Sequence, residues 1–394
     1  MKIGIHWVQF EAGGVDTQLL SMIKNWPNDD HFVLFHNKNN EGLKRISTEL
    51  GEYEVELVVF PSIKQHHVFI KFLRFIFFPI YFFWLKRKQS SIMRSIGGLD
   101  AVIVQNGTYP GSWHSLAAVW AAYKLHIKKR MLVVHHGALH SNMIHHPGEK
   151  LIDYMMHKWA TDLVTVSRAT RQTLIDYRGF DPSRNPIRVV HNGIDLSVDS
   201  TGNAVQIRKK LNIGDNVTLL GMVGRIERYK GHEDLLLAMS EMDTKMIDRL
   251  AVIFIGSGEV DETDRLNKMA HKLGLADKVI IPGYIDGDSI QLISQLNILL
   301  MLTKDFEGFG LTIAEAMIAG VPVIATKVGA VQEFVDQEVA YLVPPESPSD
   351  VARALTAYLN NLDEFKLRAK KAKKHIERFS GSKMSNQYCR LLHV

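Results

Sequence analysis

Residues 307–326 read EGFGLTIAEAMIAGVPVIAT, and the order of residue types in this stretch decides the fold. The preceding run, ILLMLT, is apolar on both faces, which predicts a buried strand that ends near Thr303. Glu307-Gly308-Phe309-Gly310 is then a turn, LTIAEAMIAG has the apolar spacing of a helix, and PVIAT is a second buried strand. Strand, turn, helix and strand in this order indicate a parallel sheet covered by helices on both sides.

The same alternation of short β-rich runs and helical segments extends over the whole chain. In the first half the predicted strands are KIGIHWV, HFVLFH, YEVELVVF, AVIVQN, RMLVVHH and LVTVS. In the second half they are VTLLGMVG, LAVIFIGSG, KVIIPGY, ILLMLT, PVIAT and YLV. We therefore expect an α/β fold of two Rossmann-like, doubly wound parallel-sheet domains that face each other, with a ligand site at the carboxyl ends of the strands.

The length of the chain also favours two domains. A chain of 394 residues exceeds what one hydrophobic core usually serves, so domains of roughly 200 residues are expected. Gly, Asn, Ser and Asp accumulate in HNGIDLSVDSTGN, residues 191–203, which places the junction there. We predict an N-terminal domain over residues 1–192 and a C-terminal domain over residues 193–376.

Composition limits the class of protein. With 46% hydrophobic and 23% charged residues the chain is an ordinary globular protein. The single cysteine, Cys389, excludes an internal disulfide and is typical of a reducing compartment. The first residues lack the pattern of a signal peptide, so we expect a cytoplasmic protein. There is no G-x-S-x-G motif, which removes support for a nucleophilic hydrolase.

One region is strongly basic and aromatic. Between Leu57 and Leu99 there is no Asp or Glu but there are seven Lys and Arg, and the region contains VFIKFLRFIFFPIYFFWLKRK. Its uninterrupted apolar part, residues 75–85, is too short for a membrane span, which needs about 20 residues. Two interpretations remain: a core helix with solvated ends, or an interfacial segment that docks on an anionic membrane surface. The second is our prediction, and a nucleic-acid patch is less consistent with buried aromatics.

That prediction names eight residues of the membrane or acceptor surface. They are Phe69, Lys71, Arg74, Phe78, Trp84, Lys86, Arg87 and Lys88.

The turn that opens residues 307–326 predicts an anion site. Glu307 lies in the turn, and Glu315 falls in the first or second turn of the helix that follows. The free N–H groups and positive dipole end of that helix attract an anion, and Gly308 and Gly310 leave room for a phosphate. A phosphate with a carboxylate on each flank suits a nucleotide-sugar, because the carboxylates accept hydrogen bonds from sugar and ribose hydroxyls.

Two cations supply the countercharge. Arg225 and Lys230 follow the strand VTLLGMVG, where a diphosphate would lie, and a solvated basic loop is the plain alternative. The turns GSGE (256–259) and PGYI (282–285) close two further strands and permit close backbone approach. The first turn, with Gly13 and Gly14, is not a dinucleotide fingerprint; it is either a substrate loop or a tight turn.

Metal-binding patterns are weak. Asp286-Gly287-Asp288 has the D-x-D form of metal-dependent glycosyltransferases, but it precedes a helix, so Asp288 or Ser289 as N-cap is the simpler interpretation. The histidines crowded between His135 and His146 match no zinc spacing. We expect no metal site.

These motifs together resemble the retaining glycosyltransferases of family 4, the group 1 glycosyl transferases, which have the GT-B fold. The second half carries VGRIERYKGHEDLL, IFIGSGE, IPGYID and EGFGLTIAEAMIAGVPVIATKVGAVQEFV in the family's order. The first half carries GGVDTQLL, VSRATRQTL and VVHNGID, and HIERFSGSKMSNQY looks like the family's closing helix, which would join residues of about 377–394 to the N-terminal domain.

The resemblance implies roles for the charged residues. Glu307 and Glu315 match the family's E-x7-E motif, whose first glutamate contacts the transferred sugar and whose second holds the ribose. Arg225 and Lys230 match the pair that neutralises the diphosphate. Gly329-Ala330 stands where two glycines are usual, which is a departure from the pattern.

The resemblance also implies roles in the first half. Gly14 matches the glycine loop near the donor, and His136 matches a histidine beside the reacting sugar, although His135 makes that register ambiguous by one. The predicted catalytic residues are Glu307, Arg225, Lys230 and His136. The predicted donor-binding residues are Gly14, Gly256, Gly258, Tyr284, Gly308, Phe309, Gly310, Leu311 and Glu315.

The expected function is retaining transfer of a sugar from a nucleotide-sugar, with UDP the commonest donor, to a glycan or lipid-linked acceptor at the inner face of the membrane, in cell-surface polysaccharide or glycoconjugate synthesis. No cofactor is expected to be obligatory, and no nucleic acid is expected as a partner. A nucleotide-sugar 2-epimerase of the same fold, which would convert UDP-GlcNAc without an acceptor, and a catalytically silent binding subunit are the alternatives.

Overall fold

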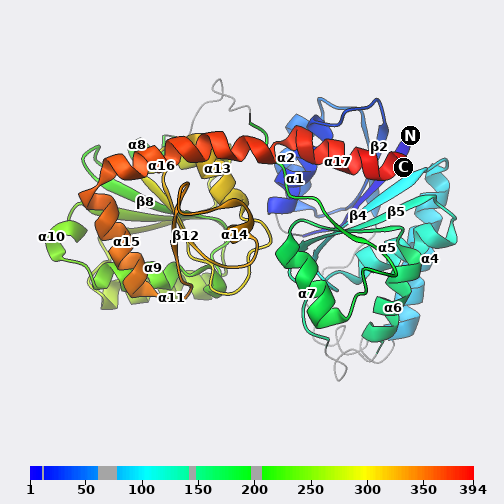
Figure 1. The fold of residues 1–394 in the computed structure, drawn as a ribbon, viewed down its shortest axis with the longest axis horizontal. Helices are drawn as coiled ribbons and strands as arrows, with labels where there is room; N and C mark the ends of the chain where they lie inside the picture. The colour runs from blue at the N-terminus through cyan, green and yellow to red at the C-terminus, as the bar shows by residue number, and fades with distance from the viewer. Residues whose placement is uncertain (11–12, 61–77, 142–147, 197–205) are drawn as a thin grey trace. The chain divides into compact units, whose positions relative to one another are not determined.

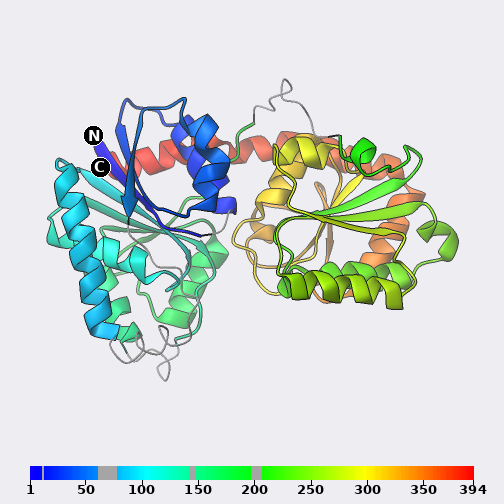
Figure 2. The same ribbon diagram turned by 180° about the vertical axis from the view of Figure 1, so that it is seen from behind.

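The computed structural model describes residues 1–10, 13–60, 78–141, 148–196 and 206–394. The chain divides into two compact units. Unit 1 comprises Met1–Gly193 and Gly381–Val394, and unit 2 comprises Ile194–Ser380. In Figures 1 and 2 each unit is a parallel sheet with helices on both faces.

Unit 1 is built on a seven-stranded sheet in the order β3-β2-β1-β4-β5-β6-β7, and every described strand pair in it is parallel. The strands are β1 Lys2–Trp7, β2 His31–Asn37, β3 Val55–Phe60, β4 Ala101–Thr108, β5 Lys129–His136, β6 Asp162–Thr165 and β7 Ile187–Val189. The helices are α1 Gly14–Lys24, α2 Glu41–Leu50, α4 Phe78–Ile96, α5 Trp113–Lys124, α6 Glu149–Trp159, α7 Arg168–Arg178 and α17 Gly381–His393.

The C-terminal helix α17 packs along α1 inside unit 1. Ser385 Oγ donates a hydrogen bond to the carbonyl of Met22, and both Met384 and Tyr388 are buried against the same cluster as Leu19. Both chain ends therefore lie close together in this unit, as Figures 1 and 2 show.

Unit 2 is built on a six-stranded parallel sheet in the order β10-β9-β8-β11-β12-β13. The strands are β8 Thr218–Val223, β9 Leu250–Ile255, β10 Val279–Gly283, β11 Ile298–Met301, β12 Val323–Thr326 and β13 Tyr341–Val343. The helical elements are α8 Ile207–Lys210, η1 Arg228–Lys230, α9 His232–Ser240, α10 Thr244–Ile247, α11 Val260–Lys272, α12 Ser289–Ser294, α13 Leu311–Ala319, α14 Val331–Phe334, α15 Pro348–Asn360, α16 Leu362–His375 and η2 Ile376–Phe379.

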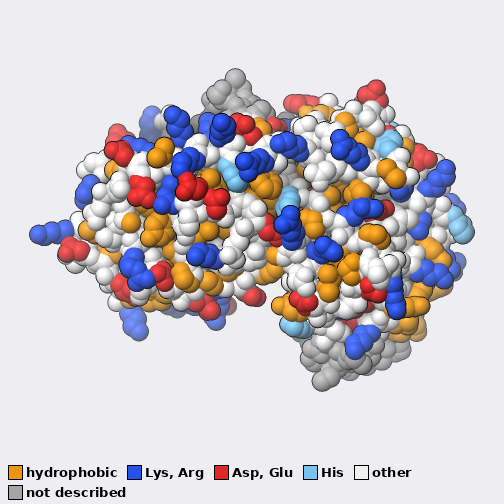
Figure 3. All heavy atoms as spheres, in the orientation of Figure 1, with side chains coloured by type: hydrophobic (Ala, Val, Ile, Leu, Met, Phe, Trp, Pro, Cys, Tyr) orange, Lys and Arg blue, Asp and Glu red, His pale blue; other side chains and the backbone are white. Residues whose placement is uncertain are grey.

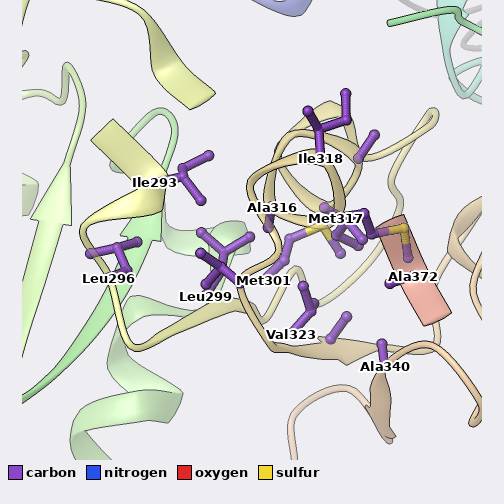
Figure 4. Close-up of a cluster of buried hydrophobic side chains, with 14 of the residues drawn as sticks. Ile293, Leu296, Leu299, Met301, Ala316, Met317, Ile318, Val323, Ala340 and Ala372 are labelled. Carbon is purple, nitrogen blue, oxygen red and sulfur yellow. The ribbon is translucent and has the colours of Figure 1, made fainter. Parts of the chain in front are cut away.

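Residues 307–326 contribute many side chains to the hydrophobic core of unit 2. Helix α13 begins after Gly310 and ends at Gly320, both in the left-handed region that favours glycine. Figure 4 shows Met317 of α13 in a cluster of buried side chains with Met301 of β11 and Val323 of β12. Because this helix is apolar almost all round, it is buried, and its amino-terminal turn is fixed in place by the sheet beneath it.

The strand orders place the switch points of the two sheets. In each unit the direction of winding reverses between the first strand and the fourth: β1 and β4 in unit 1, β8 and β11 in unit 2. Ligands of doubly wound sheets bind at the carboxyl ends of the strands at such a point. In unit 2 two loops begin at the switch point. The loop after β8 carries Arg225 and Lys230, and the loop after β11 carries Glu307.

The predicted doubly wound fold is confirmed, and each predicted strand is present. One strand, β7 (Ile187–Val189), was not predicted; it is as short as β13 but is interrupted by the exposed Arg188, so it is not an apolar run. The described helices are all too short or too polar to cross a membrane. Of the predicted membrane-surface residues, Phe69, Lys71 and Arg74 lie outside the described residues, and Phe78 is the first residue of α4.

Candidate active site

The predicted cations and the first predicted carboxylate meet in unit 2. Lys230 Nζ lies 2.8 Å from Glu307 Oε2, and the side chains of the two residues are only 22% and 15% exposed. Thr303, which is fully buried, has its hydroxyl 3.4 Å from the same Glu307 oxygen. The loops after β8 and β11 therefore converge on one ion pair at the switch point of the sheet.

Lys230 remains protonated in this setting. Burial alone lowers its pKa, but the charge of Glu307, the neighbouring Tyr229 and the hydrogen bond to Glu307 outweigh burial and raise the pKa above its usual value. The ammonium group also lies 5.0 Å from the centroid of the Tyr229 ring. A fixed cation at this point is suited to holding a phosphate.

Arg225 is the more accessible of the two predicted cations. Its Nη1 lies 2.7 Å from Glu227 Oε1, its Nη2 donates to the Tyr229 hydroxyl at 3.2 Å, and 43% of its side chain is exposed. Sequence reasoning missed Glu227 and Tyr229 as part of this site. Their position in the sequence could have indicated them, because both lie between Arg225 and Lys230 in the same short loop.

The carboxylates occupy the elements that the sequence predicts for them. Glu307 lies in the loop before α13, and Glu315 lies in the second turn of α13 and is buried. Gly308 and Gly310 are buried in the turn, and Leu311 is the first residue of the helix. The amide of Ile313 donates to the Gly310 carbonyl at 3.0 Å, and the amide groups of Leu311 and Thr312 before it are those that a helix amino terminus generally leaves available to an anion.

The side chain of Phe309 lies in the hydrophobic core rather than in the site. Its ring is 2% exposed and stacks on Phe334 with centroids 4.5 Å apart. Only the backbone of Phe309 can therefore contact a donor. The pattern E-G-F-G did not distinguish a ring that anchors the turn from a ring that binds a base.

A backbone contact fixes the position of Glu307. The amide of Ala330 donates to the Glu307 carbonyl at 2.9 Å, and Gly329 adopts φ of +51°. A side-chain carbon on Gly329 would lie 2.3 Å from that carbonyl oxygen. Position 329 therefore requires glycine, because any side chain there would clash with the backbone of Glu307. The alanine at position 330 is fully buried.

Gly256 and Gly258 serve contacts within the chain. A Cβ on Gly256 would lie 1.8 Å from the Gly224 carbonyl oxygen, and one on Gly258 would lie 2.7 Å from Ile226 Cβ. The loops after β8 and β9 therefore lie directly against each other, which supports the loop that carries Arg225. Tyr284, which follows β10, is 52% exposed.

Asp288 is the N-cap of α12 and accepts a hydrogen bond from the amide of Gln291 at 2.7 Å. This confirms the interpretation of the D-x-D sequence as a helix cap.

In unit 1, Gly14 is the first residue of α1 and Gly13 is its N-cap. Asp16 is fully buried, accepts the Gly13 amide at 2.7 Å and is hydrogen-bonded by Gln9, which gives the turn a structural role. Burial raises the pKa of Asp16 to about 6. This carboxyl was not singled out in the sequence, where it is simply one acidic residue in the first turn of a helix.

His135 and His136, either of which could match the family's histidine, are the last two residues of β5. His135 Nε2 lies 2.5 Å from Gln105 Oε1, and burial lowers the pKa of His135 to about 4, so it is neutral at pH 7. His136 is the last residue of β5, is partly buried and is aligned with Thr108 of β4. Because neighbouring side chains on a strand point to opposite faces, the two histidines do not share surroundings.

Two family models match the chain, one in each half. The model described as Glycosyltransferase Family 4 matches residues 12–198, and the model described as Glycosyl transferases group 1 matches residues 204–377. Together they cover most of both units.

Individual relatives agree with these models. An uncharacterized glycosyltransferase of Methanocaldococcus jannaschii is 26% identical over 53% of this chain and 54% of its own length. A D-inositol 3-phosphate glycosyltransferase of Geodermatophilus obscurus is 31% identical over 51% of this chain and 46% of its own. The chain thus spans about half the length of the curated relatives it matches.

Among solved structures, Anabaena HepE in complex with UDP and glucose superimposes with a TM-score of 0.77. It is 20% identical, and the match covers 100% of this chain and 99% of the other. At this identity the likeness establishes the GT-B fold.

Proposed function

Because this chain belongs to the glycosyltransferases of group 1 and family 4, we propose that it transfers a sugar from a UDP-sugar to a glycan or lipid-linked acceptor, with retention of anomeric configuration. Its role would be in cell-surface polysaccharide or glycoconjugate synthesis. The observation that carries the proposal is the ion pair of Lys230 and Glu307 at the switch point of the unit 2 sheet.

The first step is binding of the donor diphosphate. Lys230, Arg225 and the amide groups at the start of α13 provide positive charge on two neighbouring loops. The ammonium group of Lys230 then donates hydrogen bonds both to Glu307 and to a phosphate oxygen. Glu315, buried in α13, is the proposed ligand of the ribose, and Glu307 of the transferred sugar.

The second step is loss of the diphosphate as the anomeric carbon becomes cation-like. Charge grows on the leaving phosphate, where the fixed cations and the helix amino terminus stabilise it more than in the ground state. The acceptor hydroxyl oxygen then bonds to the anomeric carbon on the face that the diphosphate leaves, and the leaving phosphate accepts the proton of that hydroxyl. No metal ion is required, since the cations of the chain neutralise the diphosphate.

Unit 1 supplies two proposed contacts. Gly14 would lie near the donor, and His136 would lie by the reacting sugar, whereas His135 is committed to Gln105. The donor base is proposed to be uridine because HepE was solved in complex with UDP and with UDP-glucose.

A panel of nucleotide-sugars tests the activity. We expect release of UDP from one UDP-sugar by the wild type and loss of this release in Lys230→Met. Lys268→Met is the control, because Lys268 is an exposed lysine of α11. Conversion of UDP-GlcNAc to its 2-epimer without an acceptor would contradict transfer and identify the isomerase instead.

The acceptor is proposed to be membrane-borne because of the outer surface of α4. Phe82, Leu85 and Met93 are buried in the core, whereas Ile80, Phe83 and Trp84 are 67%, 51% and 40% exposed. The helix is therefore both a core helix and a carrier of exposed aromatics. The buried face agrees with the core-helix interpretation, and the exposed aromatics support the proposal that the other face docks on a membrane surface.

Cations surround these aromatics. Lys86 Nζ lies 4.7 Å from the centroid of Phe83, and Lys88 Nζ lies 5.9 Å from that of Trp84. Burial, and then the positive charge of Lys124 and Arg87, lower the pKa of Lys86. Figure 3 shows Lys and Arg side chains interspersed with Asp and Glu over the face of the molecule drawn there. A surface of aromatics and cations, as on α4, suits anionic headgroups above an apolar layer.

Vesicle sedimentation tests this docking. The triple variant Lys86→Ser, Arg87→Ser, Lys88→Ser should bind vesicles of anionic phospholipid roughly 100-fold more weakly than the wild type, since each cation contributes about 1 kcal/mol. The control removes three exposed lysines of α16, Lys370, Lys373 and Lys374, in the same way. Equal loss in both variants, or none in the first, would exclude α4 as the docking surface.

A further inference from the structure

Four charged side chains, which we call the Lys304 cluster, join the loop after β11 to α9 and α11. They are Lys304, Glu233, Asp234 and Arg265. Lys304 Nζ lies 2.5 Å from Glu233 Oε1 and 3.0 Å from Asp234 Oδ1. Arg265 Nη1 lies 2.5 Å from the other Glu233 oxygen, so this one carboxylate binds cations from two elements.

The Lys304 cluster is largely removed from water. The side chains of Lys304 and Asp234 are 17% and 6% exposed. Their ion pair is therefore partly buried, unlike exposed ion pairs, which contribute little to stability. Burial lowers the pKa of Lys304, but its bonds to Glu233 and Asp234 raise the pKa above its usual value. The lysine is therefore charged at neutral pH.

The cluster is adjacent to the Lys230–Glu307 pair in the chain. Lys304 precedes Glu307 by three residues, and Glu233 follows Lys230 by three. The same two segments also touch through their backbones. The Lys304 amide donates to the Tyr229 carbonyl at 2.7 Å, and a Cβ on Gly231 would lie 2.1 Å from the Leu302 carbonyl oxygen.

These contacts hold the two segments at a fixed separation. The contact of Gly231 with the Leu302 carbonyl limits how closely the loops approach, and the hydrogen bond from the Lys304 amide to Tyr229 and the charges of the Lys304 cluster hold the loops together. Lys230 and Glu307 lie on the same two segments.

We propose that Lys304 is a positioning residue of the donor site. It binds Glu233 and Asp234 at the start of α9 and thereby fixes Lys230 against Glu307; this inference rests on the proposed function for the identity of the ligand. The role of Lys304 needs no contact with the donor, because it acts through Lys230.

A double-mutant cycle on UDP affinity, measured by isothermal titration calorimetry, tests the proposal. Lys304→Met should weaken UDP binding about tenfold, and the double variant with Lys230→Met should bind no more than about twofold weaker than Lys230→Met alone. Lys304→Arg should restore most of the affinity, and Lys268→Met is the control. Additive losses, or wild-type affinity in Lys304→Met, would overturn the proposal.

Hydrogen–deuterium exchange supplies a readout that does not depend on any ligand. In Lys304→Met, residues 225–231 and 302–310 should exchange faster than in the wild type, while β9 and β12 should be unchanged. Unchanged exchange in both loops overturns the positioning role. A wild type that fails to bind UDP, together with faster exchange in the variant, would instead count against the proposed donor alone.

Discussion

Lys230 and Glu307 form an ion pair of 2.8 Å, although 77 residues separate them in the chain. The pair exists because β8 and β11 are neighbours in the sheet, and each loop leaves the carboxyl end of its strand at the same point. In the absence of donor, Glu307 neutralises the cation that we propose to bind the diphosphate. Donor binding would then add a phosphate oxygen, alongside Glu307, as a second anionic partner of Lys230.

Removing either cation should impair turnover more than donor binding. Lys230→Met and Arg225→Met should each lower kcat about 100-fold, with a smaller change in KM, because charge on the leaving phosphate increases in the transition state. Steady-state kinetics with the best UDP-sugar provide the measurement. Unchanged turnover in both single variants would contradict the assigned role.

A side chain at Gly231 should destabilise unit 2 because it would clash with the Leu302 carbonyl, and this clash can be separated from the strain of a positive φ. Gly231 and Gly274 have φ of +77° and +72°, so alanine is strained equally at both. Only at Gly231 does the added carbon meet a backbone oxygen, since Gly274 has nothing within 4 Å. Urea denaturation should show that Gly231→Ala costs at least about 2 kcal/mol more than Gly274→Ala. Equal costs would mean that the Leu302 contact does not constrain the loop.

Arg178 should be important for the stability of unit 1. It is fully buried, with Nη1 2.5 Å from Glu149 Oε2 and Nη2 2.9 Å from Asp153 Oδ2. Arg178→Met leaves two buried carboxylates without their cation and should cost about 3–5 kcal/mol. Arg184→Met, which removes an exposed pair with Asp181, should cost less than about 1 kcal/mol. Thermal unfolding of the two variants gives the comparison.

The Asp16 carboxyl should make unit 1 less stable as pH rises. Its pKa is raised to about 6 in the folded protein from 3.8, so the folded state holds the proton more tightly than the unfolded state. The contribution of Asp16 is complete below about pH 4 and is lost as pH rises through about 6, by up to about 3 kcal/mol.

The variant Asp16→Asn isolates this effect. Its unfolding midpoint in urea should match that of the wild type near pH 4 and exceed it near pH 7, because asparagine carries no charge to bury. Asp215→Asn, on an exposed residue, is the control. A wild-type advantage that grows with pH would mean that the carboxylate is stabilised in the fold.

The sequence predicted the sheets and the location of the site more fully than the contacts within the site. The predicted strands are β-rich runs dominated by apolar residues, whereas the three residues of β7 include the exposed Arg188 and so carry no such signal. The helix after Gly310 was predicted because apolar spacing and flanking glycines agree. These are local signals, and local signals survive in a folded chain when the core does not oppose them.

The remaining features depend on residues far apart in sequence. No local pattern shows that Gly256 faces the Gly224 carbonyl, or that Phe309 stacks on Phe334. Lys304 reads as an ordinary loop lysine until the sheet brings α9 against it. Such contacts follow from strand order, and strand order is set by packing of the whole unit.

The most direct test of the central claim is a crystal structure of this protein in complex with UDP. The proposed site predicts the diphosphate within hydrogen-bond distance of Lys230 and of the amide groups at the start of α13. UDP bound at another place, with this loop pair unoccupied, would contradict it.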